Sequence, residues 1–390
     1  MSQTWIEKVM SKIMQNLESD VGEKRYEYSK IDRYVTSLYN VSVIFKNKEK
    51  DEKLSLILKR PLGINTQLIN INFQFHNEIL FYRAYAKPNE NFPRCFYVDE
   101  QPPTDSVIAL ENVSDQGYCP CSYVYNAPLE YLLAAMSELG RFHGKGYVMK
   151  ELQREEFFDI VKQLQETKYP TNKIKKVKDF YNIVMRVVYY LRSQNYDTGF
   201  CDKMTDLFSN TYDKVFMKIL ELAEPLATLC HGDFTLSNNL FKMEDSGQLR
   251  AMLIDFADLK YATPVVDLSI FLCLSTSNEL IKNKFFEIMR AYHDALKEYL
   301  TDAGIWDADK YSFDAFLDNY RRGAIFGFVI ASFFLPVLMG YSNLSLQTVM
   351  NKGYVETVKE SMQSGGDKMS KILADLLLHL KDLGCLEHFL

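Results

Sequence analysis

The residues best suited to chemistry lie in the stretch 229–241 and at the acid that follows it, Asp255. Within this stretch an apolar run leads into a polar loop that carries His231, Asp233 and Asn238, and two further apolar runs lead to Asp255. The pattern predicts a short strand, a loop and a β-hairpin that brings up the second acid. One carboxylate can accept a hydroxyl proton, while the amide and the other carboxylate hold a metal ion. The stretch therefore suits phosphoryl transfer from a metal-bound nucleotide.

The same residue types also have simpler explanations. Asp233 and Asp255 can be ordinary loop acids, and His231 taken alone fits a packed core histidine. His143 lies in an apolar stretch with helical spacing, which predicts a packed or hydrogen-bonded side chain. The Cys-Pro-Cys segment at 119–121 has the wrong spacing for a zinc or redox site and is interpreted as a loop.

Length and composition predict a globular protein with two lobes and no nucleic-acid partner. A chain of 390 residues is too long for one small core, and 47% hydrophobic with 25% charged residues is ordinary for a soluble protein. The net charge of −6 offers no basic excess to meet a phosphate backbone. The richest basic run, at 173–178, is interpreted as a solvated helix face, with a local anion contact as the alternative.

The remaining bulk features favour a cytoplasmic protein. The seven scattered cysteines are an odd number, which fits reduced thiols better than a disulfide framework. The N-terminus lacks a cationic region followed by an apolar core, so no signal peptide is expected. Residues 323–340 are uncharged but only just long enough to span a membrane. They predict a buried helix that Pro336 ends or kinks, without stable membrane insertion; membrane contact is the alternative.

The first part of the chain predicts a small antiparallel sheet with one helix, over about 20–112. A preceding amphipathic helix, two strands with a charged turn between them, a helix and a last strand are expected at 4–18, 35–46, 53–60, 69–86 and 106–113. Glu78 falls on the apolar face of the 69–86 helix, where a buried carboxylate needs a partner. Lys59, at the end of the preceding strand, is the candidate; the alternative is that Glu78 points to solvent.

The rest of the chain predicts a mainly helical lobe interrupted by the strands around the catalytic stretch. Helices are expected at 127–144, 151–167, 175–194, 200–223, 266–275, 278–301, 312–335, 350–363 and 367–383. The intervening strands are expected at 228–230, 239–243 and 249–255, with Gly247 in the hairpin turn. Together the two parts predict an α+β fold.

Five residues fall in the order used by kinases of the eukaryotic-like fold: Lys59, Glu78, Asp233, Asn238 and Asp255. His-Gly-Asp in place of His-Arg-Asp resembles the small-molecule kinases of that fold, the aminoglycoside phosphotransferase and choline kinase group. The chain is similar, over about residues 5–340, to the ecdysteroid kinase-like (CHK kinase-like) family. The segments that carry this resemblance are LILKRP, FQFHNEILFY, IALENVSDQGY, ELGRFHG, LCHGDFTLSNNLF, LIDFADLKYATPVVDLSIFL and YRRGAIFGFVIASFFLPVLM.

The resemblance implies a protein-kinase-like two-lobe fold, with an N-lobe at 1–112 and a helical C-lobe at 113–390 that holds the catalytic loop, metal site and acceptor pocket. It implies that ATP and Mg²⁺ are the cofactors. Asp233 would be the catalytic base, His231 would brace its loop, and Asp267 would tie that loop from below. Asn238 and Asp255 would hold Mg²⁺. The residues implied to contact the nucleotide, with Lys59 held by Glu78, are Ser37, Lys59, Glu78, Glu111, Asn112 and Val113.

The resemblance also implies an acceptor, which is a hydroxyl of an ecdysteroid or of a related apolar or xenobiotic alcohol or glycoside. A choline- or aminoglycoside-like acceptor is an alternative. A second alternative is a catalytically impaired, nucleotide-binding pseudokinase, because the turn at 29–36 before Ser37 lacks the glycine usual in the family. Thr235 and Ala257 also depart from the family pattern, which more often has Trp and Gln there.

Overall fold

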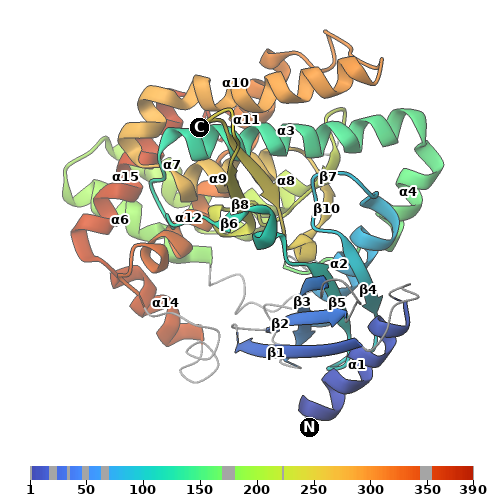
Figure 1. The fold of residues 1–390 in the computed structure, drawn as a ribbon. Helices are drawn as coiled ribbons and strands as arrows, with labels where there is room; N and C mark the ends of the chain where they lie inside the picture. Colours follow the sequence, from blue (N-terminus) through green and yellow to red (C-terminus); the bar gives the residue numbers. More distant parts are fainter. Residues whose placement is uncertain are drawn as a thin grey trace. The chain divides into compact units, whose positions relative to one another are not determined.

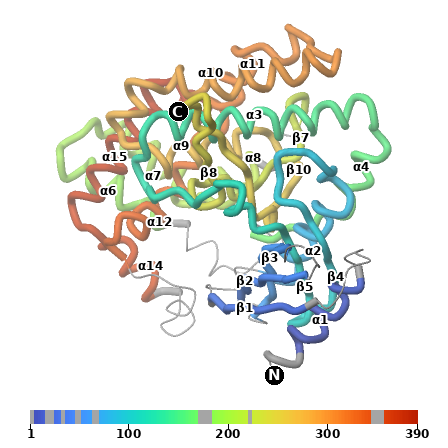
Figure 2. The backbone as a smooth tube through the Cα atoms, in the orientation of Figure 1, coloured from blue at the N-terminus to red at the C-terminus, as the bar shows by residue number. Residues whose placement is uncertain are grey.

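The computed structural model describes residues 2–16, 24–32, 36–45, 52–62, 70–168, 181–221, 224–342 and 354–389. The basic run at 173–178, the centre of the glycine-free turn at 33–35 and most of the charged turn at 46–53 lie outside them. The chain divides into two compact units (Figures 1 and 2). The first contains Met1–Cys119, Leu164–Lys168 and Ile254–Asp258, and the second contains Pro120–Gln163, Tyr169–Leu253 and Leu259–Leu390.

The first unit is built on a five-stranded antiparallel sheet with the order β1-β2-β3-β5-β4. Its elements are α1 (Ser2–Asn16), β1 (Lys24–Asp32), β2 (Thr36–Phe45), β3 (Glu52–Pro61), α2 (Ile71–Leu80), a π-helix η1 (Phe81–Tyr85), β4 (Cys95–Asp99), β5 (Val107–Glu111) and a short 3₁₀ helix η2 (Val113–Gln116). The predicted strands on β2, β3 and β5 are confirmed, whereas β1 and β4 had not been assigned.

Helix α1 covers one face of this sheet. Its apolar side chains, led by Trp5 and Ile6, form one buried cluster with alternate residues of the strands, such as Tyr39 on β2 and Leu58 on β3. Side chains alternate between the two faces of a strand, so Lys59, the neighbour of Leu58, faces away from α1. The covered face supplies the core of the unit and leaves the other face for Lys59.

The second unit is mainly helical, as predicted. Its helices are α3 (Leu129–Leu152), α4 (Arg154–Gln163), η3 (Tyr181–Val184), α6 (Met185–Ser193), α7 (Thr198–Phe208), the π-helix η4 (Tyr212–Phe216), α8 (Met217–Glu221), α9 (Val265–Ser275), α10 (Asn278–Asp302), α11 (Phe313–Gly323), α12 (Ile325–Leu338), α14 (Tyr354–Gln363) and α15 (Gly366–Asp382). The strand β6 (Cys119–Pro120) lies at the boundary of the units, and the strands β7 (Thr228–Cys230), β8 (Asn239–Met243), β9 (Leu249–Leu253) and β10 (Lys260–Ala262) frame the catalytic stretch.

Two close helix crossings hold this unit together. Helices α3 and α10 run side by side (Figures 1 and 2), and a Cβ at Gly140 would lie 2.2 Å from the carbonyl oxygen of Tyr292. Helix α12 crosses the fully buried α9 in the same way, because a Cβ at Gly327 would lie 2.2 Å from the carbonyl oxygen of Ser269. Only glycine permits either approach. Helix α9 is thereby fixed, and it carries Asp267.

Several predicted helices differ from the structure: the one expected at 127–144 continues to Leu152, and the one expected at 200–223 is divided into α7, η4 and α8. The helix expected at 312–335 is two helices, α11 and α12, which meet at Ala324 with a bend of 55°, while Pro336 lies inside the last turn of α12. The helix expected at 151–167 ends at Gln163, and the next five residues join the first unit. Among the described residues no single helix combines the length and apolar character needed to cross a membrane, although the bent pair α11–α12 has both when taken together.

Candidate active site

In the first unit Lys59 lies between two carboxylates. Its Nζ donates to Oε2 of Glu78 on α2 and to Oδ1 of Asp255, the latter at 2.9 Å. Lys59 is 8% exposed and Glu78 is 1% exposed, so the ion pair is shielded from water. The partner that the apolar face of α2 required for Glu78 is therefore Lys59, as expected.

Burial and charge shift the pKa values of this pair in a way that matters for chemistry. Burial raises the pKa of Glu78 to about 7, although the ammonium of Lys59 opposes the shift. Burial alone would lower the pKa of Lys59, but Asp255 and Glu78 outweigh it, so this pKa lies above its usual range. Among the described residues Oε1 of Glu78 has no hydrogen-bond partner, in keeping with a carboxyl that gives up its proton reluctantly. Lys59 stays cationic, whereas Glu78 titrates near neutral pH.

Asp255 is held in an unusual backbone conformation. Its φ of +68° lies in the left-handed region, which costs an L-residue other than glycine about 1 kcal/mol. The following residue, Phe256, is fully buried and stacks on Phe81 with ring centroids 3.6 Å apart. Phe256 belongs to the short 3₁₀ helix η6 (Phe256–Asp258), which the stacking fixes against the end of α2. The strained turn is thus anchored from its C-terminal side and presents the Asp255 carboxylate to Lys59.

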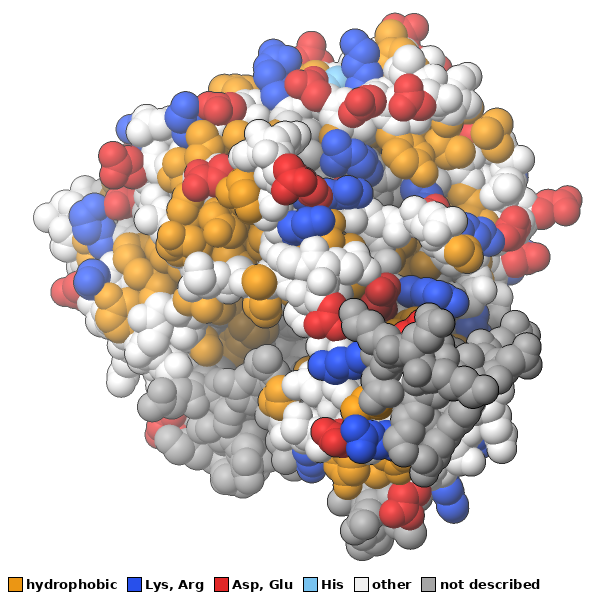
Figure 3. Space-filling model, viewed as in Figure 1, with side chains coloured by type: hydrophobic (Ala, Val, Ile, Leu, Met, Phe, Trp, Pro, Cys, Tyr) orange, Lys and Arg blue, Asp and Glu red, His pale blue; other side chains and the backbone are white. Residues whose placement is uncertain are grey.

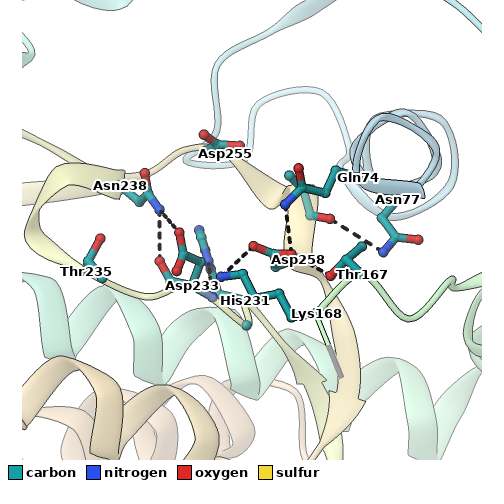
Figure 4. A network of polar contacts seen from close by, with 12 residues as sticks. Gln74, Asn77, Thr167, Lys168, His231, Asp233, Thr235, Asn238, Asp255 and Asp258 are labelled. Carbon is teal, nitrogen blue, oxygen red and sulfur yellow. Dashed lines mark hydrogen bonds and ion pairs between the residues drawn. The ribbon is translucent and has the colours of Figure 1, made fainter. Parts of the chain in front are cut away.

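In the second unit the loop between β7 and β8 carries the other predicted residues. The amide Nδ2 of Asn238 donates to the carbonyl oxygen of Asp233 at 2.9 Å and to its Oδ2 at 3.0 Å (Figure 4). The backbone N–H of Asp233 donates to Nδ1 of His231 at 3.3 Å. Both bonds of the Asn238 amide use its nitrogen, so its Oδ1 remains turned away from Asp233 and can serve as a ligand. The loop therefore offers one orienting carboxylate and one hard amide oxygen.

Asp267 on α9 braces this loop from below. Its carboxylate accepts hydrogen bonds from the backbone N–H groups of His231 at 2.6 Å and Gly232 at 2.8 Å. It also contacts Nε2 of His143 at 3.1 Å, and Nδ1 of His143 lies 2.9 Å from the hydroxyl of Tyr292. All of these groups are buried. Burial acts to raise the pKa of Asp267, but His143, His231 and the N–H of Gly232 hold it below its usual range. The hydrogen-bonded role predicted for His143 is confirmed.

Replacing Asp267 by Asn should destabilise the protein by about 2–4 kcal/mol, since buried N–H groups and His143 then lose a charged acceptor. Urea unfolding of wild type and variant measures the difference, with the exposed Asp314→Asn as a control expected to change it by less than about 0.5 kcal/mol. Because the pKa of Asp267 is depressed in the fold, the difference should be complete above the ordinary value of 3.8 and shrink as the pH falls below it. A variant as stable as the control would contradict the brace.

The residues implied to bind adenine lie where β5 ends. The N–H of Glu111 donates to the carbonyl of Arg94 at 2.8 Å, and the N–H of Asn112 donates to the carbonyl of Ser55 at 2.9 Å. Both N–H groups therefore donate to acceptors within the first unit. The contact of the 111–113 backbone with adenine stays a prediction.

Ser37 lies at the start of β2 and is buried. It shares the α1 face of the sheet with Tyr39, because the register pairs Leu38, not Ser37, with Lys59. Its side chain consequently points away from the face of Lys59. The predicted contact of Ser37 with the nucleotide stays a prediction.

Six polar residues around α2 and η6 were not singled out by sequence reasoning: Gln74, Asn77, Gln165, Thr167, Lys168 and Asp258. Within the first unit Asn77 bonds to Gln165, and Asp258 bonds to Gln74, Thr167 and Lys168 (Figure 4). The available signals were local and weak, namely that Asn77 precedes Glu78 and that Asp258 follows Asp255 by three positions. Nothing in the sequence of 164–168 pointed to this role.

Solved structures and curated proteins were compared with the chain. Among solved structures the chain is similar to an ethanolamine kinase of Plasmodium vivax (TM-score 0.43, 12% identity, covering 91% of this chain and 85% of that one). It is also similar to the GDP complex of aminoglycoside 2'-phosphotransferase-IIIa (TM-score 0.38, 12% identity, 92% and 98%). Both TM-scores are below 0.5. A comparison with curated proteins finds no significant match.

A family model identifies the chain itself. The model of the ecdysteroid kinase-like family matches residues 30–305, well over half of the sequence and all five residues of the kinase order. The antiparallel sheet with Lys59, the helix with Glu78 and the mainly helical remainder form the predicted protein-kinase-like α+β fold, which is confirmed. This fold and this match both support a small-molecule kinase. The chain belongs to the ecdysteroid kinase-like family.

Proposed function

We propose that the protein is an ATP-dependent kinase that transfers the γ-phosphoryl group to a hydroxyl of an ecdysteroid or a related apolar alcohol or glycoside. The observation that carries the proposal is the cation of Lys59 held between the carboxylates of Glu78 and Asp255. A buried ammonium that is fixed in this way can offset the negative charge of a phosphoryl donor. Lys59 contacts the donor phosphates, and Glu78 keeps it in place.

The side chains available for Mg²⁺ fit that ion. Asp255 supplies a carboxylate and Asn238 an amide oxygen, and Mg²⁺ prefers hard oxygen ligands completed by phosphates and water. Asn238 directly precedes β8, and Asp255 follows β9 by two residues. These two strands pair as one hairpin, with Asn239 opposite Leu253. When bound, Mg²⁺ would neutralise the phosphate oxygens of the nucleotide.

Asp233 acts on the acceptor. Its carboxylate orients the attacking hydroxyl and accepts its proton, while the Nδ2 of Asn238 and the brace of Asp267 keep the loop in one conformation. The acceptor class rests on the family, and apolar side chains visible on one face of the second unit are compatible with it (Figure 3). The exposed large apolar side chains of this unit include Tyr123, Val124 and Phe334.

A mass-spectrometric screen tests both the reaction and the acceptor. The protein is incubated with Mg-ATP and four acceptor sets: ecdysteroids, other apolar alcohols, glycosides, and the cationic amino alcohols and aminoglycosides. A gain of one phosphoryl group in any of the first three sets supports the proposal. Products confined to the cationic set would show that the acceptor is a cationic amino alcohol or aminoglycoside and not an apolar alcohol or glycoside. ATP binding without transfer to any set would indicate a nucleotide-binding pseudokinase.

The pKa of Glu78 predicts how activity depends on pH. Below pH 7 Glu78 takes up a proton and its attraction for Lys59 weakens, so kcat/KM for ATP should rise as the pH increases through about 7. Glu78→Gln should lower kcat/KM by roughly 100-fold, because Lys59 is then less well positioned, and should remove this inflection. Steady-state rates from about pH 5.5 to about pH 9 measure it. An unchanged inflection in the variant would assign the titration to another group.

A further inference from the structure

The segment Leu164–Lys168, here called the strap, follows α4 and belongs to the first unit. It leaves the helical conformation directly after Gln163, although the sequence pattern predicted a helix through it. Polar groups of the strap form hydrogen bonds and an ion pair with α2 and η6, two elements of the first unit. These are the elements that carry Glu78 and adjoin Asp255, the two carboxylates that hold Lys59.

On α2 the strap is held by Asn77, the residue before Glu78. The Nδ2 of Asn77 donates to the carbonyl oxygen of Gln165 at 2.8 Å, and the N–H of Gln165 donates to Oδ1 of Asn77 at 2.9 Å. Asn77 is 0% exposed, and Gln165 is half-buried. The Asn77 side chain bonds to both the N–H and the carbonyl of Gln165, as a neighbouring strand would. The two bonds fix the position of Gln165. The turn of α2 that carries Glu78 cannot shift without breaking both of them.

On η6 the strap is held by Asp258. The hydroxyl of Thr167 donates to Oδ1 of Asp258, and Nζ of Lys168 lies 2.7 Å from its Oδ2 (Figure 4). Gln74 of α2 also donates to Oδ1 of Asp258, at 3.2 Å. Asp258 is buried, and charge-assisted bonds of this kind are stronger than neutral ones. The carboxylate therefore joins the strap, α2 and η6 at one point, three residues from Asp255.

We propose that the strap is a positioning element that keeps α2 and η6 in the arrangement in which Glu78 and Asp255 both hold Lys59. Asn77, Thr167, Lys168 and Asp258 are its positioning residues, because their printed bonds join the strap to α2 and η6. Loosening the strap lets α2 move relative to η6, and Lys59 then loses one carboxylate partner or the other. The consequence falls on the nucleotide and not on the acceptor. This inference rests on the proposed function, in which Lys59 contacts the donor phosphates.

The test uses the full chain with Thr167→Val and Lys168→Met, singly and together. Lys168→Arg is the conservative variant, and Lys162→Met is the control because the exposed Lys162 pairs with the exposed Asp159 on α4. The double variant should raise KM for ATP about tenfold or more, with the KM for the acceptor unchanged. Lys168→Arg, unlike Lys168→Met, should keep most of the wild-type affinity for ATP. An unchanged KM for ATP, or no recovery with Arg, would leave the strap a purely structural segment and overturn the proposal.

Amide hydrogen exchange separates failure of the strap from failure of the proposed function, because it needs no nucleotide. In the double variant, exchange should accelerate in α2 and at residues 255–258, while the helices of the second unit keep the protection of wild type. Unchanged exchange in α2 would overturn the proposal whatever the kinetics show. If exchange accelerates in the double variant but the wild type binds no nucleotide, the strap still positions α2 and η6, and the kinase function is rejected.

Discussion

Replacing Asp233 by Asn should reduce kcat by a factor of about 10³ or more while nucleotide affinity stays within about twofold. Asn has the shape of Asp but cannot accept the hydroxyl proton. The Asn238 bond to the carbonyl oxygen of residue 233 does not depend on that side chain, so the loop keeps its form. Phosphorylated product is measured by mass spectrometry and ATP binding by calorimetry.

The matched control for this change is Asp245→Asn. Asp245 is an exposed acid in the turn of the β8–β9 hairpin, and its replacement should leave kcat and ATP affinity unchanged. A turnover of Asp233→Asn near that of wild type would reject Asp233 as the base. Loss of both binding and turnover would indicate a collapsed loop, which urea unfolding of the variant would reveal. Only the loss of turnover with retained binding supports the assigned role.

The second large effect is expected for Asp255→Asn, which should lower kcat/KM by a factor of about 10³ and shift the Mg²⁺ dependence of the rate to higher concentration. The amide is a weaker metal ligand than the carboxylate, and Lys59 also loses one of its two anionic partners. Asn is the appropriate replacement because it tolerates the left-handed backbone at φ +68° better than Ala would. The change therefore removes the charge without adding strain.

Titration of the rate with Mg²⁺, at saturating ATP and acceptor, measures this effect. The concentration of Mg²⁺ for half-maximal rate should increase about tenfold or more in Asp255→Asn and stay unchanged in Asp245→Asn. Stability should change by less than about 1 kcal/mol, since the Phe256 anchor remains. A rate whose Mg²⁺ dependence matches wild type would remove Asp255 from the metal site.

Much of the candidate site follows from local pattern. The spacing of His231, Asp233 and Asn238 between two apolar runs predicted a loop between strands, and the structure has β7 and β8 there. The apolar face around Glu78 predicted a buried carboxylate in need of a cation, which is Lys59. Both predictions succeed for the same reason: the cost of burying an unpaired charge, and the periods of helix and strand, can be evaluated within a short window.

The details that set the geometry of the site lie beyond such a window. The sequence predicted a helix that continued to residue 167. Asn77 and Asp258, each about 90 residues away in sequence, instead provide hydrogen-bond partners for the strap outside a helix. Similarly, the face of β2 that Ser37 occupies depends on which residues pair with β3. The bend at Ala324 follows Gly323, where the amphipathic α11 gives way to the uniformly apolar α12, but the 55° angle between the helices is set by the packing of each on its neighbours.

By itself, then, the sequence of this protein determined the fold class, the order of the reactive residues and the ion pair of Lys59 with Glu78. These depend on residue type and short-range periodicity. Only the tertiary structure decided that Asp255 adopts a left-handed backbone and joins Lys59, that His143 contacts the carboxylate of Asp267, and that the strap ties α2 to η6. Each of these is a hydrogen bond or packing contact between segments far apart in the chain, and its partner exists only after the core has formed.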